Sequence, residues 1–457
     1  MGPEGDHLQH EYIPNTEEDI REMLAAIGVR SIDELFTDIP REVLERYEPL
    51  GLEPLSELEV VKELERLARK NLDPREYISF LGGGIYDHFV PSVVDYVLAR
   101  SEFYTSYTPY QPEVSQGTLT WMFEFQTFIC ELTGMEVANA TMYDGATALA
   151  EALFMAARVT KKRKFLVAKS LNPHYLEVLR TYAWAAELEL HELPYTEAGQ
   201  LDRGALAAAL SDEDRDEIGG LLLQTPNFFG VIEDLSGLKE ELGEALLIVS
   251  ANPIALGILK PPGEFGADIV TGEGQVLGNR PNFGGPLLGL FASREKYLRQ
   301  MPGRIIGQTV DVDGKVGYVM TLQAREQHIR RARATSNICS NEALCGLAAT
   351  VFLAALGKEG LRELAEVNLQ KAHYLAGRIE ELPGCRPRFS GPFFNEFVVK
   401  LPKEPQAVLA RLREEKILGG LDLTPYGLEN SLLIAVTEKR TRTEMDLFVR
   451  KLEEIIR

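Results

Sequence analysis

Five short apolar runs decide the fold: KFLVAKS (residues 164–170), GLLLQT (220–225), ALLIVS (245–250), ADIVT (267–271) and PLLGLFA (286–292). Their apolar residues are consecutive rather than alternating, which is typical of strands that are buried on both faces. Helical stretches or long crossovers separate the runs. The pattern therefore predicts an α/β fold with a mostly parallel central sheet, in which ligands bind at the carboxyl ends of the strands.

The large α/β domain that contains these runs is expected to span residues 76–330. Before it, residues 1–75 alternate short amphipathic helical patterns with prolines, and Thr16 followed by Asp19 resembles a helix start. Helices this short do not form a core of their own, so we interpret this part as an arm that wraps another surface. Residues 331–457 are expected to form a small α+β domain with helices at 343–357, 361–382, 405–415 and 442–456 and strands at 395–401 and 431–436.

Composition excludes several classes of function. The 457 residues contain 48 Lys and Arg against 69 Asp and Glu, a formal net charge of −21, which disfavours nucleic-acid backbones and anionic membranes as partners. The least polar stretch, residues 343–357, is shorter than the roughly 20 residues that span a bilayer. The four cysteines lack metal-ligand spacing, and the N-terminus lacks a signal-peptide pattern. We expect a cytoplasmic enzyme or enzyme subunit without a metal site.

Two helix starts are candidate binding elements. Asp144, Gly145 and Thr147 precede a run of helix formers, where free backbone amides suit a phosphate group, although this motif by itself favours Asp144 as a simple N-cap. His174 follows Asn172 and Pro173 on the first turn of another expected helix. There it could stack on a flat ligand ring, and a core or solvent-facing histidine fits the pattern equally well.

Two further stretches suggest an interface. Tyr104, Tyr107 and Tyr110 recur at a three-residue step in a proline-braced segment, which is suited either to enclosing a small polar ligand or to packing against another subunit. The stretch QHIRRARATSN, residues 327–337, concentrates positive charge in an acidic protein. It is either a solvated helix face or an anion-binding element at a subunit boundary.

Five segments of the sequence together resemble the glycine decarboxylase (P-protein) family of the glycine cleavage system, and the resemblance is nearest to the first subunit of its two-chain form. They are LGGGIYDHFVP (81–91), YTPYQPEVSQGTL (107–119), DGATALAEA (144–152), PPGEFGADI (261–269) and REQHIRRARATSNIC (325–339). The resemblance covers nearly the whole chain. It implies the fold type I architecture of pyridoxal-phosphate enzymes, with a helical arm and a small C-terminal domain.

The sequence departs from that architecture at its chemical centre. Enzymes of this fold hold the cofactor through a Lys just past the strand at 267–271, and no Lys occurs between Lys260 and Lys296. The carboxylate expected beside the pyridine nitrogen is also missing, because Ala251 and Asn252 follow the strand that ends at Ser250. The cofactor pocket is therefore expected to be degenerate, with no catalytic residue on this chain alone.

The resemblance then implies a second subunit that carries the Lys and the pyridoxal phosphate, in a complex expected to be α2β2. Together the subunits would decarboxylate glycine and pass the aminomethyl group to the lipoyl carrier protein. The loop expected to line the substrate and interface comprises Tyr104, Tyr107, Tyr110, Gln111, Glu113, Ser115 and Gln116. A turn of Thr335, Ser336 and Asn337 is expected at the partner's cofactor phosphate, with His328, Arg330 and Arg331 as further anion contacts.

Vestigial or structural duty is assigned to the ancestral pocket residues Asp144, Gly145, Thr147, His174, Asn252 and Gln275. Two alternatives stay open at this point. One is a non-catalytic scaffold that stabilises the complex, and the other is an independent pyridoxal-phosphate enzyme with an unusual amine.

Overall fold

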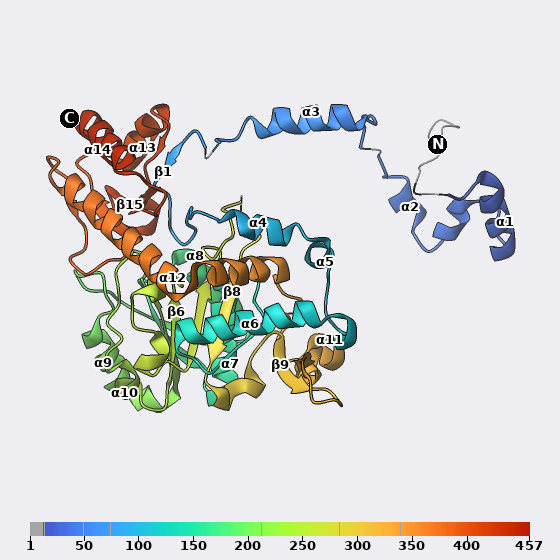
Figure 1. Cartoon of the computed structure of the whole chain (residues 1–457), viewed down its shortest axis with the longest axis horizontal. Coiled ribbons are helices and arrows are strands. Elements are labelled where there is room, and N and C mark those ends of the chain that lie inside the picture. Colours follow the sequence, from blue (N-terminus) through green and yellow to red (C-terminus); the bar gives the residue numbers. More distant parts are fainter. Residues whose placement is uncertain are drawn as a thin grey trace. The chain divides into compact units, whose positions relative to one another are not determined.

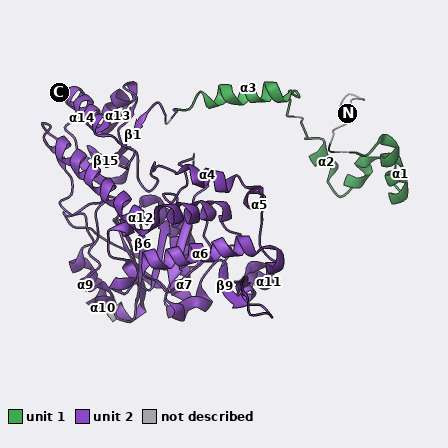
Figure 2. Ribbon diagram, viewed as in Figure 1, with its two compact units in different colours: residues 1–72 green, residues 73–457 purple. Residues whose placement is uncertain are grey.

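The computed structural model describes residues 12, 14–48, 50–73, 75–211, 213–282, 284–338 and 340–457. Cys339 and residues 1–11, whose sequence was read above for a signal peptide, lie outside the described residues. The chain divides into two compact units, residues 1–72 and residues 73–457 (Figure 2). We call them the arm and the body.

The arm contains α1 (Glu17–Ile27), the 3-10 helix at Ile32–Phe36, α2 (Arg41–Leu44) and α3 (Glu57–Ala68). The expected helix start is confirmed, because the Thr16 hydroxyl accepts a hydrogen bond from the Asp19 amide and the Asp19 carboxylate accepts one from the Thr16 amide. Ser56 and Glu59 form the same capping box at α3. Local sequence therefore fixes where these helices begin.

The body is built on a seven-stranded sheet in the order β2-β8-β7-β6-β5-β3-β4. Its strands are β2 (Val137–Ala138), β3 (Lys164–Ala168), β4 (Glu189–Leu193), β5 (Ile218–Thr225), β6 (Leu246–Ala251), β7 (Ile269–Glu273) and β8 (Gly289–Ser293). The five strands from β3 to β7 pair in parallel, whereas β8 is antiparallel to both β7 and β2. The predicted α/β fold with a mostly parallel sheet is confirmed, and all five apolar runs form strands in it.

Helices cover both faces of this sheet (Figure 1). One face, which includes Leu221 and Leu247, packs against a core shared with α6 (Gln116–Thr133) and the first half of α12 (Ala343–Glu380). The other face, which includes Leu222 and Ile248, packs against α7 (Gly145–Thr160) and α8 (Pro173–Ala185). Successive residues of one strand thus enter different cores, which explains why the runs are apolar at consecutive positions.

A second sheet lies near the end of the chain, in the order β11-β12-β15-β14, formed by β11 (Arg386–Pro387), β12 (Glu396–Lys400), β14 (Leu421–Asp422) and β15 (Ser431–Ala435). It shares a core with α13 (Pro405–Glu414), α14 (Arg442–Ile456) and the second half of α12. The strands predicted at 395–401 and 431–436 and the helices predicted at 405–415 and 442–456 agree with β12, β15, α13 and α14 to within one residue. The helix predicted at 361–382 corresponds to the second half of α12, which follows Gly357 and ends at Glu380.

The least polar stretch forms the first half of α12. Gly357 adopts φ 63° and ψ −177°, so it breaks the helix where the sequence predicted a stop, and a second helical segment follows at once. By length and composition alone, α12 could cross a membrane, but half of its most apolar window is buried inside the body. It therefore has the environment of a core helix.

The remaining elements were not predicted. A hairpin of β9 (Ile305–Val310) and β10 (Val316–Thr321) projects beyond the main sheet, and β1 (Ile78–Ser79) pairs in parallel with β13 (Ile417–Leu418). The short helices are α4 (Ser92–Leu98), α5 (Ser101–Tyr104), α9 (Arg203–Ser211), α10 (Leu238–Leu242) and α11 (Gln327–Arg330).

Candidate functional site

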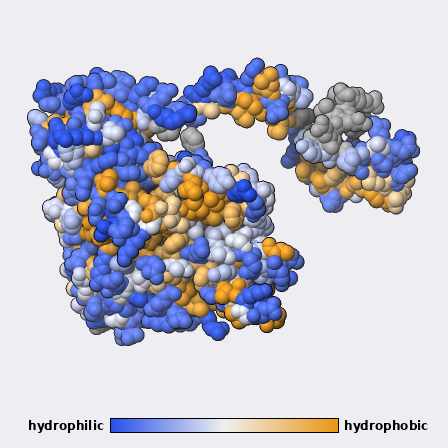
Figure 3. Space-filling model, viewed as in Figure 1, coloured by the Kyte–Doolittle hydropathy of each residue, from blue (hydrophilic) through white to orange (hydrophobic). Residues whose placement is uncertain are grey.

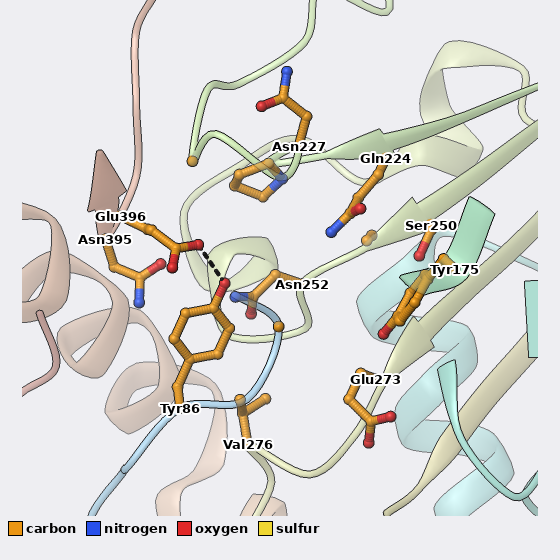
Figure 4. A pocket seen from close by; sticks show the side chains of 14 residues that line it. Tyr86, Tyr175, Gln224, Asn227, Ser250, Asn252, Glu273, Val276, Asn395 and Glu396 are labelled. Atoms are coloured by element: carbon orange, nitrogen blue, oxygen red, sulfur yellow. Dashed lines mark hydrogen bonds between the residues drawn. The ribbon is translucent and has the colours of Figure 1, made fainter. Parts of the chain in front are cut away.

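A polar pocket lies at the carboxyl ends of β5, β6 and β7, where the fold predicts a ligand site. Gln224, Asn252 and Glu273 reach it from these three strand ends. Figure 4 shows Tyr86 and Glu396 on one side, Tyr175 and Glu273 on the other, and Asn252 between them.

The Glu273 carboxyl lies at the start of α7, where the free backbone amides could otherwise bind an anion. Its Oε2 accepts a hydrogen bond of 2.9 Å from the Gly145 amide, and its Oε1 accepts from the amides of Gln275 and Leu288, each at 2.9 Å. Burial raises the pKa of this carboxyl to about 7, against the opposing effect of the three amides. The free amides of a helix start attract anions, and here the chain's own carboxyl uses one of them.

The Asp144 side chain accepts a hydrogen bond from a second amide at the start of α7. Its Oδ1 accepts from the Thr147 amide at 2.8 Å, so Asp144 is the N-cap, as its position suggested. Asp144, Thr147 and His174 line a second, more open hollow, which Tyr175 and Glu273 also line. Because Glu273 and Asp144 accept from the Gly145 and Thr147 amides, these two donors are not available to a phosphate.

Gln275 stands in the loop where enzymes of this fold carry the cofactor lysine, and its amide is fully committed. The Oε1 atom accepts from the Tyr86 amide at 3.1 Å, while Nε2 donates to the Tyr86 carbonyl at 3.1 Å and to the Asn279 carbonyl at 2.5 Å. The side chain is completely buried. Gln275 therefore ties the segment around Tyr86 to the sheet.

Asn252, at the place of the missing carboxylate, uses its side-chain oxygen to accept from the Ile254 amide at 2.9 Å. It thereby caps the short turn that follows β6. With no lysine in residues 261–295, with carboxyl groups at the α7 amides and with Gln275 bonded to backbone, the residues present do not fit a covalently held pyridoxal phosphate.

A second buried carboxyl, Glu396, faces the pocket from β12. It accepts from the Gly83 amide at 2.7 Å and from the Tyr86 hydroxyl at 2.7 Å, and burial raises its pKa to about 7. A Cβ atom at Gly82 would lie 2.1 Å from the Glu396 Oε1 atom, which explains why the chain needs a glycine beside this carboxyl. Sequence reasoning missed Glu396 and Tyr86, although an acidic residue within an apolar strand and the run LGGG were visible signals.

His174 has the predicted position on α8, whose N-cap is Asn172 and whose first residue is Pro173. Its side chain is mostly exposed, and its ring lies edge-on to Tyr426 with centroids 6.3 Å apart. The predicted pocket residues Asp144, Gly145, Thr147, His174, Asn252 and Gln275 are thus gathered around one sheet edge.

The tyrosine loop lies elsewhere, on the surface of the body. Tyr104, Tyr107 and Tyr110 are 67%, 77% and 50% exposed, and Gln111 and Glu113 are exposed as well. Ser115 is partly exposed at the start of α6. Gln116 is bonded to β10 instead, because its side chain exchanges two hydrogen bonds of 2.9 Å with the backbone of Tyr318.

The basic stretch meets this loop. The rings of Tyr110 and His328 lie edge-on with centroids 5.9 Å apart, and the Arg304 guanidinium is 6.0 Å from the Tyr110 ring. Arg330 and Arg331 are exposed in short helical turns. The structure therefore brings the two predicted interface stretches together and adds Arg304 to them. Arg304 could not be found from either motif, because it directly precedes β9 in another part of the sequence.

The Thr335–Asn337 turn follows directly. The Thr335 amide donates to the Arg325 carbonyl at 3.1 Å, the Ser336 hydroxyl accepts from the Ile338 amide at 3.1 Å, and Asn337 is exposed. Arg325 donates to the carbonyls of Met301 and Gly303, so it holds the stretch in place.

Comparison with known proteins identifies relatives of the whole chain. The model of the glycine cleavage system P-protein family matches residues 10–452. A protein of Desulfitobacterium hafniense named probable glycine dehydrogenase (decarboxylating) subunit 1 is 53% identical over 97% of this chain and 99% of its own length. A Geobacillus thermodenitrificans protein of the same name is 54% identical with the same coverage.

Solved structures agree. A glycine decarboxylase (P-protein) of the glycine cleavage system, crystallised in inhibitor-bound form, has a TM-score of 0.89 and 45% identity, over 98% of this chain and 100% of that one. A Burkholderia pseudomallei sphingosine-1-phosphate lyase, at 15% identity and TM-score 0.64 over 91% of this chain and 94% of its own, shares the fold. The fold is thus that of fold type I pyridoxal-phosphate enzymes, as expected from the resemblance. Because the family model and close relatives both span almost the entire chain, the chain belongs to the glycine cleavage system P-protein family.

Proposed function

We propose that this chain is the subunit of a two-chain glycine dehydrogenase (decarboxylating) that lacks the bound cofactor. The observation that carries the proposal is the pocket at the sheet edge, where Glu273 bonds to the start of α7 and Gln275 bonds to the Tyr86 backbone. A chain of this family that cannot hold the cofactor requires another polypeptide that does. The relatives named subunit 1 support such a pairing.

Removing the carboxylate of glycine as carbon dioxide requires an acceptor for the electron pair left behind, and pyridoxal phosphate supplies one in enzymes of this fold. In this proposal the second subunit binds that cofactor covalently through its lysine, in an α2β2 assembly in the cytoplasm. The aminomethyl group then passes to the lipoyl carrier protein. The present chain contributes binding and positioning at the subunit boundary.

That contribution is assigned to the surface formed by the tyrosine loop and the basic stretch. Tyr104, Tyr107 and Tyr110 supply rigid aromatic area with polar tips, and Tyr110 contacts His328. Aromatic side chains of this kind are enriched at protein interfaces and exclude water from them. The Thr335 hydroxyl, Ser336 and Asn337 lie at the end of the same basic stretch, where amides and hydroxyls suit the phosphate of the partner's cofactor.

The test is release of labelled carbon dioxide from carboxyl-labelled glycine, with the lipoyl carrier protein present. We expect no release from this chain alone, none above background from the second subunit alone, and release from the two together. Turnover by this chain alone would contradict the proposal. Full turnover by the second subunit alone would instead support a scaffold role.

A further inference from the structure

The pocket at the carboxyl ends of β5, β6 and β7 has a polar lining. On the face of the body that Figure 3 shows, hydrophilic and hydrophobic areas are mixed. Inside the pocket most of the lining side chains are polar, and they include the carboxyl groups of Glu273 and Glu396. Ligand pockets are usually lined mainly by apolar side chains with a few polar groups. The lining of this pocket therefore favours a small ligand that is itself polar or charged.

The charge around the pocket is negative. Glu273 and Glu396 line it, and Asp144 lines the adjoining hollow, which shares Tyr175 and Glu273 with the pocket. Among the described residues that line either space there is no Lys or Arg, and the only imidazole is that of His174. A cleft lined by one sign of charge attracts ligands of the opposite sign. The lining therefore favours a cation over an anion.

Neither carboxyl group has a cationic partner among the described residues. Glu273 accepts only from backbone amides, and Glu396 accepts from one amide and from the Tyr86 hydroxyl. The titratable groups that face them are Tyr86, Tyr175 and Asp144, none of which supplies positive charge. Each Glu396 oxygen accepts one bond and has a second lone pair. A primary ammonium group would supply both the missing charge and donors for these lone pairs.

Three side-chain amides of the pocket have unused donors. Asn395 is 2% exposed, and its Nδ2 atom is buried without a hydrogen-bond partner among the described residues. Gln224 and Asn252 use their oxygens to accept from the Asn172 and Ile254 amides, each at 2.9 Å, which leaves their NH2 groups for a ligand. A buried donor without an acceptor is destabilising. These amides therefore favour a ligand that carries an acceptor oxygen as well as the positive charge.

We propose that this pocket binds a small primary ammonium compound that carries an acceptor oxygen, as an amino alcohol or an amino acid does. The ammonium group donates to Glu396, and the oxygen accepts from the amides of Asn395 and Asn252. Figure 4 shows Asn252 between Glu396 and Glu273, so one small molecule meets both kinds of group. The site belongs to this chain alone, and the inference does not depend on the proposed function.

The experiment is isothermal titration calorimetry of the full-length chain with four probes. Ethanolamine and glycine carry both groups, methylammonium lacks the oxygen, and acetate lacks the ammonium group. We expect one-to-one binding of ethanolamine or glycine, and the tighter of the two identifies the source of the ligand. Methylammonium and acetate should each bind at least about tenfold more weakly, because each forfeits one set of hydrogen bonds.

The test variant is Glu396→Gln, and its matched control is Glu429→Gln at an exposed side chain. Because Glu396→Gln removes a charge-assisted hydrogen bond, the dissociation constant should rise about tenfold or more. Glu429→Gln should stay within about twofold of wild type. An unchanged thermal midpoint at pH 6 confirms that each variant is folded.

The pH dependence of the wild-type chain tests the inference without any substitution. The pKa of Glu396 is about 7 in the empty pocket, so this carboxyl is ionised mainly above that pH. Ethanolamine or glycine should therefore bind about tenfold more tightly at pH 8 than at pH 6. Glu396→Gln should reduce this dependence.

Four outcomes would overturn the inference. They are the absence of saturable binding for every probe, acetate binding as tightly as ethanolamine and glycine, methylammonium binding as tightly as they do, and equal affinity of wild type and Glu396→Gln. The last outcome would place the ligand elsewhere on the chain.

Discussion

Glu396 gives the stability of the body a pH dependence that can be worked out from the structure. Its folded-state pKa is about 7, raised from 4.5 by burial. Because the folded state holds the proton more tightly than the unfolded state, the stabilisation is complete below pH 4.5 and is lost as the pH rises through 7. A shift of this size corresponds to about 3 kcal/mol in full, of which about 2 kcal/mol is lost between pH 5.5 and pH 8.

We consider Glu396→Gln, whose side-chain oxygen can still accept from the Gly83 amide, whose NH2 group can donate to the Tyr86 hydroxyl oxygen, and which cannot ionise. Urea unfolding at pH 5.5 and at pH 8, followed by circular dichroism, gives the difference in unfolding free energy between variant and wild type. We expect that difference to move by about 2 kcal/mol in favour of the variant from pH 5.5 to pH 8. The control is Glu429→Gln, which makes the same substitution at an exposed side chain. A Glu396→Gln difference that is the same at both pH values would refute the reasoning.

Three further predictions concern the pocket and the interface. Gly230→Ala should lower the free energy of unfolding by about 3 kcal/mol in urea titrations. The reason is that Gly230 has φ 78° and that a Cβ atom at this position would lie 1.8 Å from the Glu396 carbonyl oxygen. A loss below about 1 kcal/mol would contradict this close approach. Gln275→Ala leaves the buried backbone groups of Tyr86 without partners, so the same titration should show a loss of about 3 kcal/mol, whereas unchanged stability would show that these bonds contribute nothing. Tyr107→Ala and Thr335→Ala should each reduce glycine turnover of the two-subunit complex about tenfold or more. The thermal midpoint should change little, since both residues are at least partly exposed in this chain. Unchanged turnover and unchanged affinity for the carrier protein would favour a scaffold role.

The central strands were predictable because burial on both faces leaves a signal within each strand. The edge strand β4 gave none, since its sequence ELHEL is polar and mostly accessible to solvent. The start of β7 was placed two residues early because Asp268 belongs to the turn, where its carboxylate accepts from the Leu247 amide. The antiparallel direction of β8 could have been predicted, since the described residues between 274 and 288 form no helix, and a parallel crossover usually requires one.

The candidate site was predictable only where its residues follow the strands and helix starts. Asn252 and Gln275 were found because they follow strand ends. The sequence alone also showed that the expected carboxylate and lysine are missing there. Glu396 escaped because its partner, the Gly83 amide, lies 313 positions away in the chain. The bond between Glu273 and the start of α7 likewise depends on packing that no local pattern records.

Borohydride reduction tests the proposal that this chain holds no covalent cofactor of its own. The chain alone and the assembled two-subunit complex would each be incubated with pyridoxal phosphate, reduced, digested and mapped by mass spectrometry. We predict that the pyridoxyl group appears at one lysine of the second subunit, and that this chain is labelled only at the background level of exposed lysines. Stoichiometric labelling of a single lysine on this chain, with an absorbance that glycine perturbs, would contradict the account.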